Sequence, residues 1–147
     1  MSCGAAIGAL AVVAALPGSA QAASVHANSA RPGTVYSYYA DCSTTGAYGY
    51  VGLTTTTNNG PSNKWSASFE IKDTLADGKH AQARLVTTDA TGHQHDWSWH
   101  YNTSGNGVTV VVDTTAQDTT NGIVNLGIEV ARGSGSTVDN TCTNWVF

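Results

Sequence analysis

The feature that most constrains the fold is a segment in which apolar and polar side chains alternate. It covers residues 65–73 and places Trp65, Ala67, Phe69 and Ile71 at every second position, with serine, glutamate and lysine between them. Successive side chains of a β-strand point to opposite faces, so this pattern predicts a strand with one buried and one solvated face. Such strands are stable only when their apolar faces are buried against one another.

From residue 34 onward the chain consists of similar short segments, rich in β-branched and aromatic residues and separated by Gly, Asn, Asp and Ser. No stretch keeps a 3.6-residue period over three turns, so we expect little helix. This spacing is typical of an all-β domain. We expect about eight strands, over residues 34–40, 48–57, 65–73, 81–88, 93–101, 108–113, 124–130 and 138–147.

The expected architecture is an antiparallel β-sandwich spanning residues 34–147 as one domain, with an up-and-down β-barrel as the alternative. The Asp77-Gly78 pair tolerates the positive φ angles of a hairpin return, and further turns are expected at residues 89–92 and 102–107. These turns predict an antiparallel meander of the four strands between residues 65 and 113.

Residues 1–22 have the features of a cleaved export signal. An apolar run over residues 5–16 precedes Pro17-Gly18 and a small-residue site that ends at Ala22. The run is shorter than the roughly 20 residues that span a bilayer. Nothing before Arg31 is basic, so a start codon upstream of Met1 is an alternative. We expect a secreted, extracellular protein whose mature N-terminus, residues 23–33, is flexible.

Removal of the signal would take Cys3 with it and leave Cys42 and Cys142. Export places them in an oxidising compartment, so the sequence predicts a disulfide between these two residues. The alternative is a pair of buried free thiols.

The charge pattern excludes two classes of partner. The formal net charge is −4, only 11% of the residues are charged, and the basic residues are not clustered. Nucleic acids and anionic membranes require clustered basic residues, so neither is expected as a partner. The sequence also lacks a Gly-x-Ser-x-Gly elbow and a phosphate-binding loop, and the disulfide would remove the cysteines as nucleophiles. A non-catalytic protein without a cofactor is expected.

The richest segment for binding covers residues 93–101. On one continuous strand its aromatic and imidazole rings would share a face, which could stack on the apolar faces of sugar rings. The alternative is that the two tryptophans fill the core. The predicted ligand-binding residues are His93, His95, Trp97, Trp99 and Tyr101.

Metal binding is not expected. His93 and His95 could supply half of a zinc site, but a third ligand would have to come from His26, His80, His100 or a distant carboxylate. Aspartates at positions 73, 77, 113 and 118 follow strand ends and could contact Ca²⁺. Capping of turns is the favoured role for them.

Residues 71–101, IKDTLADGKHAQARLVTTDATGHQHDWSWHY, combine an Asp-Thr strand exit, an Ala-Asp-Gly turn, an Ala-rich strand with Arg84 and a Trp-bearing strand. In this part the chain resembles a group of small, uncharacterised secreted proteins of actinomycetes. The resemblance implies an exported β-fold of bacterial origin. No activity is assigned to that group, so it implies no functional residue.

Three functions are compatible with this sequence. The leading hypothesis is a secreted recognition module for carbohydrate or cell-wall surfaces. The second is a protein-interaction or inhibitor protein that binds through loops 105–107 and 133–136, and the third is a small hydrolase. Further aromatic candidates for the first function are Trp65, Trp145, Tyr36, Tyr38, Tyr48 and Tyr50.

Overall fold

The computed structural model describes residues 35–56 and 63–147, so the expected signal peptide and N-terminal segment lie outside the described residues. The described chain is all β, and it contains no helix long and apolar enough to cross a membrane. Its strands are β1 (Tyr36–Thr44), β2 (Ala47–Thr55), β3 (Trp65–Asp73), β4 (His80–Asp89), β5 (Gln94–Asp96), β6 (His100–Asn102), β7 (Thr109–Ala116), β8 (Ile123–Ser134) and β9 (Thr137–Trp145).

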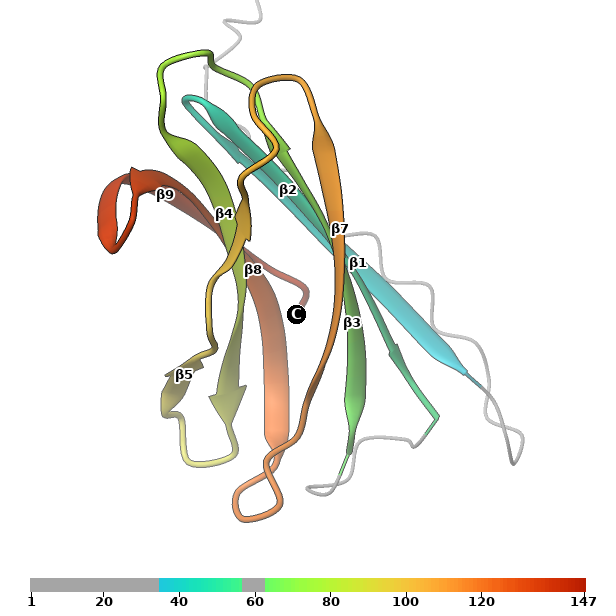
Figure 1. Cartoon of the computed structure of the whole chain (residues 1–147). Coiled ribbons are helices and arrows are strands. Elements are labelled where there is room, and N and C mark those ends of the chain that lie inside the picture. The colour runs from blue at the N-terminus through green and yellow to red at the C-terminus, as the bar shows by residue number, and fades with distance from the viewer. Residues whose placement is uncertain (1–34, 57–62) are drawn as a thin grey trace, which may run out of the picture.

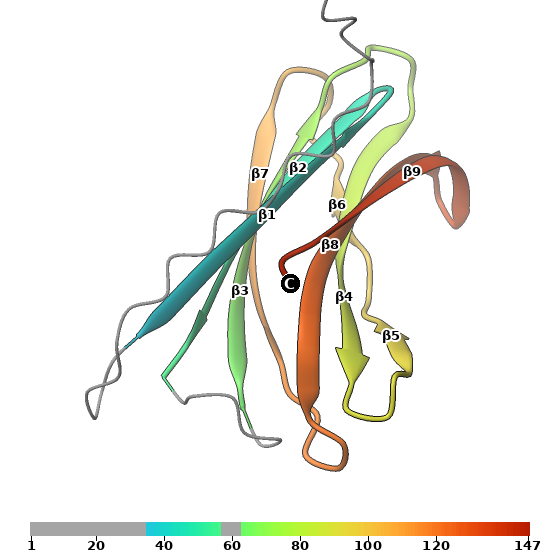
Figure 2. The same ribbon diagram turned by 180° about the vertical axis from the view of Figure 1, so that it is seen from behind.

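The strands form two antiparallel sheets that pack face to face (Figure 1). The first sheet has the order β1-β2-β3-β7, and the second has the order β5-β4-β8-β9, with β6 also paired to β4. The view from behind shows the same two layers (Figure 2). The sheets do not close into a barrel, so the β-sandwich prediction is confirmed.

The alternation predicted for residues 65–73 is confirmed along the whole of β3. Every second side chain is buried between the sheets, and those in between are exposed. The apolar residues of this face meet the apolar face of the second sheet, and removing both faces from water is the main stabilising contribution to the sandwich. The largest side chains of this core are Trp65, Phe69, Leu53 and Ile71 from the first sheet and Leu85, Leu126 and Ile128 from the second.

The predicted meander is wrong. β3 pairs with β2 and β7, whereas β4 pairs with β5, β6 and β8. The Asp77-Gly78 turn does form, with a φ of 75° at Gly78, but it carries the chain from the first sheet to the second. The chain returns to the first sheet at β7 and crosses again to β8. Alternation indicates which face of a strand is buried, but it does not indicate which strand lies beside it.

The strand expected over residues 93–101 is interrupted by a bulge. β5 and β6 both pair with β4, through Val86 opposite Asp96 and Ala83 opposite His100. Two residues of β4 therefore lie opposite three residues, 97–99, of the other chain segment. One extra residue reverses the faces to which the following side chains point. The expected common face for residues 93, 95, 97, 99 and 101 is thus wrong.

The predicted disulfide between Cys42 and Cys142 is present. It joins β1, at the edge of the first sheet, to β9, at the edge of the second, with the two Cα atoms 6.1 Å apart. Side-chain hydrogen bonds also join the sheets along the same side. Thr44 Oγ1 donates to Asn140 Oδ1 at 3.0 Å, and Asn144 Nδ2 donates to the Asp41 carbonyl at 2.8 Å.

Candidate functional site

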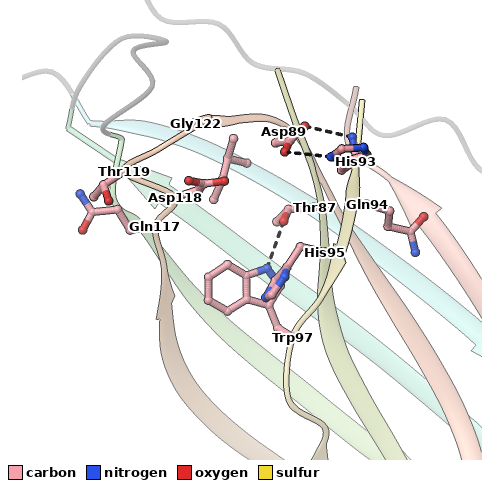
Figure 3. A pocket seen from close by; sticks show the side chains of 11 residues that line it. Thr87, Asp89, His93, Gln94, His95, Trp97, Gln117, Asp118, Thr119 and Gly122 are labelled. Carbon is pink, nitrogen blue, oxygen red and sulfur yellow. Dashed lines mark hydrogen bonds and ion pairs between the residues drawn. The ribbon is translucent and has the colours of Figure 1, made fainter. Parts of the chain in front are cut away.

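A pocket of about 310 Å³ lies at one end of the sandwich, where the turn between β4 and β5 meets the loop between β7 and β8 (Figure 3). Gln117, Asp118 and Thr119 line one side, and residues 93–95 line the other. The indole of Trp97 lies between these two sides. The pocket therefore collects side chains from two chain segments that are at least twenty positions apart in the sequence.

Trp97 is held in place by three kinds of contact. Its backbone N–H donates to the Leu85 carbonyl at 3.0 Å, its Nε1 donates to Thr87 Oγ1 at 3.1 Å, and its ring packs partly against the core. The His95 ring meets the indole edge-on, with the ring centroids 4.7 Å apart. Because both rings also line the pocket, they form an aromatic wall on it.

Asp89 ties together the two segments that build the pocket. Its carboxylate accepts hydrogen bonds from the backbone N–H of Thr91 and of His93 at 2.8 and 2.9 Å and from the Thr91 hydroxyl at 2.7 Å. Asn121 Nδ2 donates to the other carboxylate oxygen at 3.2 Å. The bonds from Thr91, His93 and Asn121 lower the pKa of Asp89 to about 2. The carboxylate is therefore ionised at neutral pH.

Loss of this charge should loosen the pocket in acid. The folded-state pKa of Asp89 lies below its usual value, so its contribution to stability is present at neutral pH and is lost as the pH falls from about 4 towards 2. We expect the amide of His93 to exchange hydrogen faster in Asp89→Asn than in the wild type at pH 6. Hydrogen exchange monitored by NMR tests this, and equal rates in the two proteins would contradict it.

Only three of the five predicted ligand-binding residues reach the pocket. These are His93, His95 and Trp97. Trp99 lies instead against Arg84, whose guanidinium carbon is 4.5 Å from the ring centroid. Arg84 is itself paired with Asp96 and Glu129 on the outer face of the second sheet.

The remaining predicted residue, Tyr101, is opposite Gln82 of β4 and is 42% exposed. After the bulge it is His100 whose ring turns towards the core, 5.4 Å from Phe69, and burial lowers the pKa of this imidazole. Of the further aromatic candidates, Trp65 and Tyr36 are buried and so are unsuited to bind a ligand.

Three of the four aspartates considered as calcium ligands cap turns, as favoured from the sequence, whereas Asp113 lies within β7, opposite Ser68, and not at a strand end. Asp73 Oδ1 accepts from the Leu75 amide, Asp77 Oδ1 from the Lys79 amide, and Asp118 Oδ1 from the amides two and three residues after it. Among residues 35–56 and 63–147, no group of three or more His, Cys, Asp or Glu side chains is placed to hold a metal ion.

Sequence reasoning missed the polar half of the pocket. Thr87, Asp89, Gln117 and Thr119 were not singled out as binding residues, and Asp118 was considered only for turns and calcium. The turn at residues 89–92 was expected from its Asp-x-x-Gly pattern, and the Asn121-Gly122 pair is a local turn signal of the same kind. No local signal indicates that these two turns meet in space.

No protein-family model, no curated protein and no solved structure matches this chain.

Proposed function

We propose that this protein is a secreted, non-catalytic recognition module that binds carbohydrate in the pocket at the end of the sandwich. The observation that carries the proposal is the pairing of the Trp97 and His95 wall with hydrogen-bonding side chains across a pocket of about 310 Å³. A sugar ring offers C–H groups that pack on an aromatic face and hydroxyls that bond to amide, carboxylate and hydroxyl groups. Small-molecule sites commonly combine such an apolar surface with a few polar groups.

The charges of the pocket favour a neutral sugar. Asp89 and Asp118 are among the residues that line it, and no lysine or arginine is. Sulfated, phosphorylated or uronic ligands would meet like charge there, without the cation that normally pairs with such groups. The Cys42–Cys142 disulfide supports the secreted location, because such bonds persist in oxidising compartments.

The test is titration calorimetry with cello-, xylo- and chito-oligosaccharides, using His95→Ala and Gln117→Ala. His95 is exposed, so its removal should cost little stability. We expect each variant to bind the recognised sugar about fivefold more weakly or worse, since one lost contact of about 1 kcal/mol corresponds to that factor.

Tyr101→Ala is the matched control, because it removes an exposed ring that lies outside the pocket. It should bind as the wild type does. Failure of all three sugar series to bind the wild-type protein, or an equal loss in Tyr101→Ala and His95→Ala, would refute the proposed function.

A further inference from the structure

A second hollow of about 430 Å³ lies on the outer face of the four-stranded sheet. It runs across three neighbouring strands, β2, β3 and β7, and we call it the sheet groove. Most of its lining side chains end in hydroxyl or carboxylate groups, which bond well to sugar hydroxyls. The residues used below are Gly52, Thr54, Ser66, Ser68, Asp113 and Thr115.

One end of the sheet groove is bounded by an aromatic ring. Gly52 has no side chain, and a Cβ placed there would lie 3.7 Å from the ring of Tyr50, so the tyrosine lies beside the glycine. Tyr39 stacks on Tyr50, with the ring centroids 6.2 Å apart and an interplanar angle of 25°. Tyr39 is 38% exposed. The sheet groove thus repeats the combination found in the pocket, an aromatic surface beside hydroxyl and carboxylate groups.

The sheet groove and the pocket approach each other at the end of β7. Asp113 and Thr115 line the sheet groove, and Gln117, two positions further along the chain, lines the pocket. Two residues of extended chain span about 7 Å. Because β7 is the edge strand of its sheet, no neighbouring strand separates the two hollows at this point.

We propose that the sheet groove is a second subsite for the same ligand, and that this ligand is a neutral, linear oligosaccharide that runs from the pocket over the edge of β7 towards Tyr50. The inference rests on the proposed function. It is supported by the closeness of the two hollows along β7, by the repeated aromatic and hydroxyl lining, and by the charge of the surface. The residues lining the sheet groove include Asp113 but neither lysine nor arginine, which favours neutral over anionic chains.

The test compares cello-, xylo- and chito-oligosaccharides of one to six units with wild-type protein and Gly52→Leu. Gly52 has no positive φ, and a Cβ there meets the Tyr50 ring only at contact distance, so the strand backbone accepts a side chain and the leucine projects into the sheet groove. We expect the affinity of the wild type to rise at least tenfold between the disaccharide and the hexasaccharide. Gly52→Leu should abolish this gain and leave disaccharide affinity unchanged.

Ser43→Leu is the matched control, because it adds the same side chain at an exposed position of β1 that does not line the sheet groove. Ser43→Leu should keep the rise in affinity from the disaccharide to the hexasaccharide. Two results would overturn the second subsite: a wild-type affinity that does not change with the length of the sugar, or the same hexasaccharide affinity in Gly52→Leu and the wild type. Either result would do so even if His95→Ala weakens disaccharide binding, which tests the pocket alone. Absence of binding by every sugar overturns the proposed function together with the second subsite.

Discussion

Removal of the disulfide, by Cys42→Ala with Cys142→Ala, is expected to lower the free energy of unfolding by about 2–5 kcal/mol. The bond closes a loop of 100 positions, so its loss frees a long stretch of the unfolded chain. In the folded state it joins the edges of the two sheets. The side-chain hydrogen bonds between the sheets on the same side remain and contribute only about 1 kcal/mol each. Urea denaturation followed by tryptophan fluorescence measures the loss.

Reduction of the wild-type protein provides the control for this double substitution. The reduced protein keeps both sulfur atoms, so it separates loss of the covalent bond from loss of the cysteine side chains. The urea concentration at the midpoint of its unfolding should fall by nearly as much as that of the double variant. If the free energy of unfolding decreased by less than about 1 kcal/mol in both the reduced protein and the double variant, the cross-link would contribute little to stability.

The second large effect is expected at Asn102, a buried residue of β6 with no exposed surface. Its Nδ2 donates to the carbonyls of Ile71 at 2.8 Å and Val108 at 2.7 Å, and its Oδ1 accepts from the Ser104 amide at 2.9 Å. Ile71 belongs to the opposite sheet, so the amide bridges the sandwich. We expect Asn102→Ala to lower the free energy of unfolding by about 2–4 kcal/mol, because buried groups lose their partners.

Two further substitutions give this prediction its controls. Asn102→Asp keeps the shape but places an acceptor against two carbonyl oxygens, so it should destabilise at least as much as alanine. Thr103→Ala changes the exposed neighbour and should stay within about 0.5 kcal/mol of the wild type. If denaturation curves placed the stability of Asn102→Ala within about 0.5 kcal/mol of the wild type, the hydrogen bonds of Asn102 between the two sheets would not be needed for stability.

The elements that could be predicted are those with local causes. The alternation of β3 indicated its buried face, and short segments without helical period indicated an all-β sandwich. The pairing of Cys42 with Cys142 could be predicted because Cys3 lies in the expected export signal and because export places the other two cysteines in an oxidising compartment. The capping aspartates followed from the hydrogen bonds that such side chains make to amides two or three residues away.

The candidate site was predicted only in part, for reasons visible at particular residues. The segment 93–101 was identified as important, and His93, His95 and Trp97 do line a pocket. Trp99 and Tyr101 were misplaced, because a one-residue bulge is set by pairing with β4 and not by the segment itself. The same bulge directs His100 and Asn102 inwards.

By itself, the sequence determined that this chain forms two-faced strands, which of their faces are apolar, and which two cysteines can pair. These properties depend on residue type and on spacing along a few positions of backbone. Only the tertiary structure decided which strands are neighbours, where the extra residue of the bulge lies, and that the turn at Asp89 meets the loop at Asp118. Those contacts join residues far apart in the chain, and their formation depends on how the whole core packs.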